Sequence, residues 1–204
     1  MTTHGSPTRS ERRRACPGAD AGFTLIELMV TIAIAAVLLM LAAPSFVAFQ
    51  RNSELTSQTN APVAALGAAR TEAMKRNFNA RVEAKDGNWN NGWVVYVDLD
   101  DNDAYNANTD VLVMDQPPLV SYFGMTGTGT AAASPPYVRF NSSGYPVNNG
   151  GGFGALTFSM ARSDLTGTAL LEQTRRIMIA KTGRVRTCKP TSASDTKCSA
   201  SATD

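Results

Sequence analysis

The segment from Glu172 to Cys198 carries the residues best suited to bind a charged ligand. It contains seven basic and two acidic residues, so its net charge is +5, whereas the whole chain of 204 residues has a net charge of only +2. The basic residues are Arg175, Arg176, Lys181, Arg184, Arg186, Lys189 and Lys197. Guanidinium groups bind phosphate oxygens in bidentate fashion, so this segment is a candidate surface for a phosphate-bearing polymer.

Arg184 and Arg186 are two residues apart, so in an extended strand their side chains leave the same face. Gly183 before them permits a sharp turn. No aromatic residue occurs between Glu172 and Asp204, so the segment itself has no platform for stacking bases. We therefore expect it to bind a phosphate backbone through charge and shape rather than through base sequence. The alternative is a solvated edge strand whose charges discourage aggregation.

An acidic stretch is the second candidate site. Asp98, Asp100 and Asn102 alternate like the start of an EF-hand loop, and the region from Asp98 to Asp115 holds six aspartates and no Lys or Arg. Asp103 replaces the turn glycine of such a loop, and Thr109 stands where the bidentate Glu is required. A solvated loop is the preferred interpretation, and weak cation binding is the alternative.

The composition excludes most enzyme classes. The only histidine is His4, so a chain shortened at its N-terminus has no histidine for Ser-His-Asp catalysis or for a His-ligated metal. An enzyme would then need a desolvated Asp, Glu or Lys as general base, and no spacing indicates one. We expect no catalytic site, no metal site and no cofactor.

An apolar segment must anchor these candidate sites. No charged residue occurs from Leu28 to Gln50, which as a helix would extend for about 34 Å, enough to cross a bilayer. Four arginines precede it, so the positive-inside rule places residues 1–22 in the cytoplasm and the rest of the chain across the membrane. Glu27 is the exception within the apolar region, and its carboxylate must either reach the headgroups or meet a cationic partner.

The stretch Gly22-Phe23-Thr24-Leu25-Ile26-Glu27-Leu28 resembles the processing motif of type IV pilins and type II secretion pseudopilins. The resemblance implies that a prepilin peptidase cuts after Gly22 and that Phe23 becomes the N-methylated terminus. Glu27 would neutralise the terminal amine of a neighbouring pilin in the filament. It also implies a bacterial inner-membrane protein with a periplasmic domain, which joins a pilus or pseudopilus after assembly.

Two cysteines, Cys188 and Cys198, would then lie in an oxidising compartment. A disulfide between them would close a small loop and hold the basic segment near the domain. Two free thiols are the alternative.

Further phrases resemble the FimT/GspH branch of these proteins: residues 66–77, Gly92-Trp93-Val94, and Gly183-Arg184-Val185-Arg186, which is similar to the GRxR signature of FimT-type minor pilins. The resemblance implies binding of double-stranded DNA during natural transformation through Arg184 and Arg186. Lys181, Arg175, Arg176 and Lys189 join them by proximity. The competing hypothesis is a structural, GspH-like minor pseudopilin that does not bind DNA.

The predicted fold is α+β, with one long helix packed on antiparallel sheets. We expect a leader over 1–22, a membrane-spanning and filament-core helix over 23–50, a globular domain over 51–190 and a flexible tail over 191–204. Pro44 should kink or locally melt the helix, which resumes from Arg51 to Asn77 with a weaker point at Pro62. An alanine-rich face, to which Ala64 and Met74 also belong, should pack on a sheet, with Arg70, Glu72, Lys75 and Arg76 on a solvated face. Seven strands are predicted, at 81–84, 93–98, 111–115, 120–123, 137–140, 155–159 and 176–181.

Overall fold

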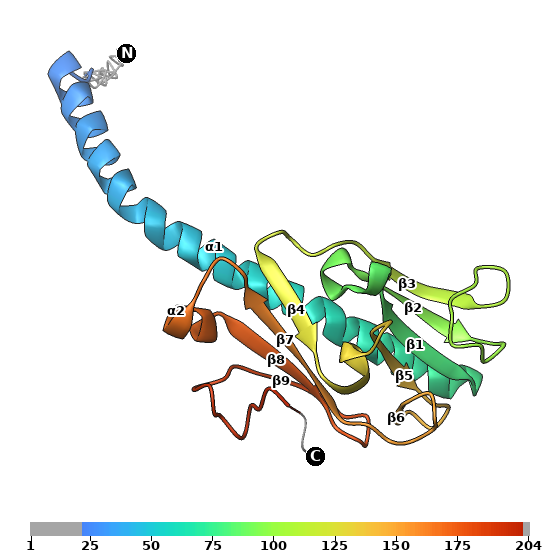
Figure 1. Ribbon diagram of the computed structural model, residues 1–204. Helices are drawn as coiled ribbons and strands as arrows, with labels where there is room; N and C mark the ends of the chain where they lie inside the picture. Colours follow the sequence, from blue (N-terminus) through green and yellow to red (C-terminus); the bar gives the residue numbers. More distant parts are fainter. Residues whose placement is uncertain (1–21, 202–204) are drawn as a thin grey trace, which may run out of the picture. The chain divides into compact units, whose positions relative to one another are not determined.

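A computed structural model describes residues 22–201 (Figure 1). The predicted leader, apart from Gly22, lies outside the described residues. The chain divides into two compact units, one ending at Phe46 and the other beginning at Val47. Each unit is considered by itself below.

Helix α1 runs from Leu25 to Arg76. Its first part is apolar, and the window Leu25–Ala42 has a mean hydropathy of 2.7 and is long enough to cross a membrane. The hydroxyl of Thr24 accepts a hydrogen bond from the Glu27 backbone N–H at 3.2 Å and so caps the first turn.

The predicted local melting at Pro44 is wrong, because α1 is helical without a break through both Pro44 and Pro62. A proline removes one backbone donor, and the hydrogen bonds of the turns on either side keep the helix intact. The helix ends one residue before the predicted position. Asn77 follows it with φ of 61°, the left-handed conformation that commonly terminates helices.

Five strands form the first sheet of the globular unit. They are β1 (Asn79–Ala84), β2 (Trp93–Asp98), β3 (Val111–Gln116), β5 (Tyr137–Phe140) and β6 (Pro146–Val147). Their order is β3-β2-β1-β5-β6, and all pairs are antiparallel. Two short 3-10 helices, η1 (Lys85–Gly87) and η2 (Trp89–Asn91), connect β1 to β2.

Four strands form the second sheet. They are β4 (Phe123–Gly127), β7 (Leu156–Arg162), β8 (Thr174–Ile179) and β9 (Val185–Cys188), in the order β4-β7-β8-β9. The 3-10 helix η3 (Gly129–Ala132) follows β4, and the short helix α2 (Gly167–Glu172) connects β7 to β8. All pairs are antiparallel, so both sheets have the predicted class.

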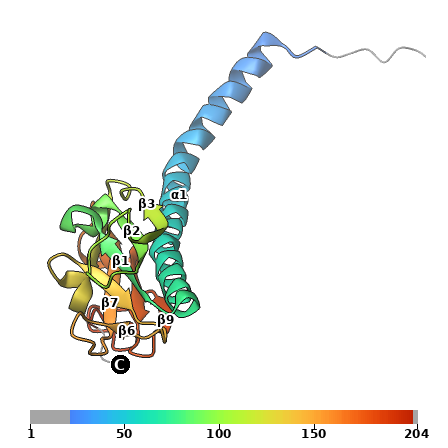
Figure 2. The same ribbon diagram turned by 90° about the vertical axis from the view of Figure 1, so that its right-hand side faces the viewer.

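The core lies between the second part of α1 and both sheets (Figure 2). Leu66, Ala69 and Ala73 of the helix are buried in the same cluster as side chains of both sheets, Val138 and Phe158 among them. Small side chains allow a helix to approach a sheet closely, so the alanine-rich face packs as predicted. Ala64 and Met74, which were assigned to this face, are exposed instead.

One predicted strand is displaced. Residues 120–123 were expected to form it, but the Phe123 backbone N–H donates to the Val120 carbonyl in a turn, and β4 begins only at Phe123. Strand β6 and helix α2 were not predicted. A strand of two residues has no periodicity in the sequence, so only its pairing with β5 defines it.

Candidate functional site

The turn between β8 and β9 presents two of the predicted basic residues. We call residues 180–184 the hairpin tip. The Gly183 backbone N–H donates to the Ala180 carbonyl at 2.8 Å, and the Ala180 N–H donates to the Arg184 carbonyl at 3.0 Å. Lys181 and Arg184 are exposed on this closed turn.

Gly183 is buried in the hairpin tip, with φ of +78°. A Cβ at this position would overlap the carbonyl oxygen of Gly144, in the turn between β5 and β6. Arg70 of α1 holds the two turns together, because its Nε donates to the Gly144 carbonyl at 2.9 Å and its Nη2 to the Thr182 carbonyl at 3.2 Å. The prediction that Arg70 lies on a solvated helix face is therefore wrong. Glu72 instead pairs with Lys75 and Arg76 on the helix itself.

Arg186 lies on β9 opposite Met178 and is half-buried. Its Nη1 donates to the Lys197 carbonyl at 3.0 Å, so this guanidinium also contacts the chain that follows β9. Lys189, just beyond β9, is exposed.

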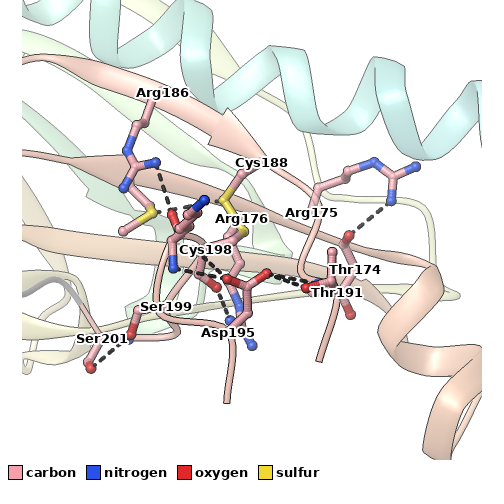
Figure 3. The surroundings of a disulfide bond; sticks show 12 residues. Thr174, Arg175, Arg176, Arg186, Cys188, Thr191, Asp195, Cys198, Ser199 and Ser201 are labelled. Carbon is pink, nitrogen blue, oxygen red and sulfur yellow. Dashed lines mark hydrogen bonds between the residues drawn. A yellow bond between two sulfur atoms is a disulfide. The ribbon is translucent and has the colours of Figure 1, made fainter. Parts of the chain in front are cut away.

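Arg175 and Arg176 point in different directions (Figure 3). Arg176 is buried and donates from Nη1 to the Cys198 carbonyl, while its Nε has no hydrogen-bond partner among the described residues. Arg175 extends toward α1, where its Nη2 donates to the Asn52 side chain at 3.3 Å. Burial lowers the pKa of Arg175 from its ordinary value.

The disulfide predicted between Cys188 and Cys198 is confirmed, with the two Cα atoms 5.9 Å apart (Figure 3). We call residues 188–198 the disulfide loop. A flexible tail was expected from Thr191 onward, but Cys198 is buried and covers Arg176. The carboxylate of Asp195 stabilises the loop. It accepts hydrogen bonds from the backbone N–H groups of Thr191, Lys197 and Cys198 at 2.9–3.1 Å.

These hydrogen bonds lower the pKa of Asp195 to about 2, with the Thr191 backbone N–H as the largest cause. Because this value is below the ordinary value of about 3.9, the carboxylate stabilises the loop above pH ~4. That contribution is lost as the pH falls through about 2. A carbon-detected NMR titration should therefore give a midpoint near 2 for Asp195.

In the same experiment the Asp195→Asn variant, which keeps the side-chain shape, should exchange its Thr191 and Cys198 amide protons faster at neutral pH. A titration midpoint near 4, with unchanged amide exchange in the variant, would contradict this role.

The basic residues of the C-terminal segment share a second property. All nine ion pairs of the described residues use cations outside this segment. Those cations are Arg51, Lys75, Arg76, Arg81, Lys85, Arg139 and Arg162. Among the described residues, neither Glu172 nor Asp195 forms an ion pair with any of the seven basic residues. The positive charge of the segment is therefore not compensated by local ion pairs.

The acidic stretch is only partly solvated. Asp98 is 2% exposed and accepts the backbone N–H groups of Asn102 and Asp103 at 3.2 and 3.0 Å, and burial raises its pKa. Asp103 pairs with Arg81 at 2.8 Å and with Arg139 at 3.1 Å. Carboxylate oxygens of Asp98, Asp100 and Asp110 lie within 4.8 Å of one another. Backbone amides and arginines thus already stabilise much of this negative charge, and we assign no site to it.

Two exposed aromatic residues near the hairpin tip were not among the site residues predicted from the sequence. Tyr145 follows Gly144 directly, and its ring contacts that of Phe153 edge-on, with the centroids 5.4 Å apart. Both residues follow turn signals that the sequence displays, Asn141–Gly144 and Asn148–Gly152. Nothing in the sequence indicates that the first of these turns, Asn141–Gly144, lies close to Gly183.

The residues of the processing motif lie at the start of the described chain. Gly22 and Phe23 precede α1 and are exposed, Phe23 by 81%, and Glu27 is in the first turn of the helix.

Two family models match this chain. Residues 18–43 match the family model described as the prokaryotic N-terminal methylation motif. Residues 58–183 match the model described as type II transport protein GspH, a match that ends before Arg184. A search of curated proteins finds no match.

Among solved structures, the type IV minor pilin FimU of Pseudomonas aeruginosa is similar in two crystal forms. The identities are 19% and 18%, with TM-scores of 0.49 and 0.47, and each alignment covers 68% of this chain and 90% of FimU. The GspH match covers more than half of the chain and includes the helix face, the first sheet, strands β4, β7 and β8 of the second sheet and the start of the basic hairpin. The protein therefore belongs to the GspH family, within the FimT/GspH branch of type IV pilins and pseudopilins.

Proposed function

We propose that this family member is a FimT-like minor pilin, which binds double-stranded DNA through its basic C-terminal region and supports DNA uptake and pilus assembly. It acts as a binding and structural subunit and not as an enzyme. Before assembly it is held in the inner membrane by the first part of α1, with the globular unit in the periplasm.

The observation that carries the proposal is the uncompensated charge of residues 172–198. Seven cations lie in this segment, and none takes part in an ion pair of the described chain. Elsewhere Arg70 alone among the described basic residues has no carboxylate partner, and it is bonded to two carbonyls. A cluster of this kind attracts the phosphate backbone of DNA and releases its counterions on binding.

The residues divide into two groups by their contacts. Lys181, Arg184 and Lys189 are exposed and, with Arg186 beside them, are the side chains that contact phosphates. Arg175 and Arg176 support the interface, since Arg176 holds the disulfide loop and Arg175 contacts α1.

Assembly uses the other end of the chain. Prepilin peptidase cleaves after Gly22, Phe23 becomes the methylated terminus, and Glu27 pairs with the terminal amine of a neighbouring pilin. Such a cation neutralises a carboxylate in an apolar helix, and the pair sets the register of subunits rather than adding stability.

The test is fluorescence anisotropy of labelled duplex DNA with the full chain in a nonionic detergent, across a salt series. If three to five phosphates are neutralised, the log–log salt slope should be roughly −3 to −4.5. The double variant Arg184→Gln, Arg186→Gln should bind about tenfold more weakly at low salt, and its slope should be shallower by about 2.

A variant that removes the same charge elsewhere, Arg51→Gln with Lys85→Gln, is the control and should bind nearly as the wild type. Equal affinities for the two double variants would remove Arg184 and Arg186 from the interface.

A GspH-like minor pseudopilin of a type II secretion system is the second candidate. The description of the matching family favours it, as does the end of that match at residue 183, before the two arginines. Absence of DNA binding by the oxidised wild type at low salt would make this candidate the better one.

A further inference from the structure

Phe153 has an unusual exposure for a large apolar side chain. It is 60% exposed, more than any other large apolar residue of the described chain that follows α1, and Tyr145 beside it is 40% exposed. Met74 of α1, also exposed, has its sulfur close to Gly144, just before Tyr145. Two adjoining exposed rings offer apolar surface of the kind that binding sites use.

The backbone holds these two rings in place. Phe153 forms an antiparallel bridge with Val147, and the Gly154 N–H donates to the Pro146 carbonyl at 3.1 Å. The intervening turn is closed by the Asn148 side chain, which accepts the Gly152 N–H at 2.9 Å. The Tyr145 N–H donates to the Asn141 side chain at 3.0 Å. The backbone that carries the rings is therefore fixed before any ligand binds, which lowers the entropy lost on binding.

The aromatic pair lies next to the basic hairpin tip. The Gly144 carbonyl is in close contact with Gly183, and Arg70 bonds to both turns. Tyr145 and Arg184 each directly follow one of these two glycines. The turn that leads to the aromatic pair thus contacts the turn that carries the basic residues, although the two turns belong to different sheets.

We propose that Tyr145 and Phe153 stack on unpaired nucleotide bases while Lys181 and Arg184 bind the adjoining phosphates. The protein then binds single-stranded DNA, and duplexes with single-stranded ends, more tightly than blunt duplexes. This inference rests on the proposed DNA binding and adds a base-stacking component to it. Every base has a π-face, so the preference is for strandedness and not for sequence.

The experiment compares three labelled probes with the full chain in a nonionic detergent. One is a thymidine oligomer of about 20 nucleotides, longer than the site of a typical single-strand-binding domain. The second is an abasic backbone of the same length and charge, and the third is a blunt duplex. Phe153→Ala and Tyr145→Ala are the variants. Tyr105→Ala is the matched control, because Tyr105 is 37% exposed and belongs to the acidic stretch.

The wild type should bind the thymidine oligomer more tightly than the abasic backbone. Phe153→Ala should weaken binding of the thymidine oligomer about tenfold and leave the other two probes nearly unchanged. Tyr105→Ala should change none of the three.

Unchanged thymidine affinity in Phe153→Ala, with duplex binding intact in the wild type, would overturn this inference alone. If the wild type bound no DNA of any kind, the proposed function would fail together with it. If Phe153→Ala instead reduced self-association in sedimentation and left all DNA binding unchanged, the face would be a contact between subunits and the inference would be wrong.

Discussion

Replacing Gly183 with alanine should lower the free energy of unfolding of the globular unit by about 3 kcal/mol. Gly183 has φ of +78°, a conformation that is strained for any residue with a Cβ. The added carbon would also overlap the Gly144 carbonyl and approach Arg70 Nε to 3.1 Å. Hydrogen bonds fix both turns, so neither backbone can move away without breaking one of them.

Gly87→Ala separates the two causes. Gly87 has φ of +70°, but no atom lies within 4 Å of the position that a Cβ would take. This variant should therefore show only the backbone strain, about 1 kcal/mol. Urea unfolding followed by the fluorescence of Trp89 and Trp93, both buried in the globular unit, measures the two variants. If both variants lost the same free energy of unfolding, the contact between Gly183 and Gly144 would contribute nothing to the effect of Gly183→Ala.

The Gly183 contact shows what the sequence could and could not predict about the site. The sequence correctly indicated a turn at Gly183, directly before the two arginines, because such a turn depends on neighbouring residues. It could not indicate that Gly144 lies against Gly183, since the two glycines belong to turns of different sheets. Arg70 was misassigned for the same reason, because its acceptors are 74 and 112 residues away in the chain.

More of the fold than of the site could be predicted from the sequence. The change from an apolar helix to short β-branched segments predicts an α+β class without any tertiary information. Strand β6 has only two residues, and its position is set by pairing with β5 and by the bridge from Val147 to Phe153. The exposed aromatic pair was missed together with this strand. Strand pairing and the contact between turns of the two sheets therefore determine the parts that the sequence did not predict.

Removing the disulfide with Cys188→Ser and Cys198→Ser should lower the free energy of unfolding by about 2.5–3 kcal/mol, from the closure entropy of a loop of about eleven residues. A second loss follows from the contacts of the loop. The buried guanidinium of Arg176 donates to the Cys198 carbonyl, and a detached loop would leave that group with fewer acceptors. Cys16→Ser, which removes the third cysteine and no bond of the described chain, is the control and should unfold like the wild type.

The same double variant tests how the loop contributes to DNA binding. Arg186 donates to the Lys197 carbonyl, so the closed loop holds the Lys197 backbone beside this guanidinium, and Lys189 directly follows β9. A detached loop keeps its charges but must order them on binding, so affinity should fall while the salt slope, which counts neutralised phosphates, stays nearly constant. The variant Arg184→Gln, Arg186→Gln should instead make the slope shallower, because it removes charges. Anisotropy across a salt series distinguishes the two effects. If the salt slope became equally shallow in both variants, the expectation would be wrong. The detached loop would then have lost its phosphate contacts altogether, rather than making them at a higher entropic cost.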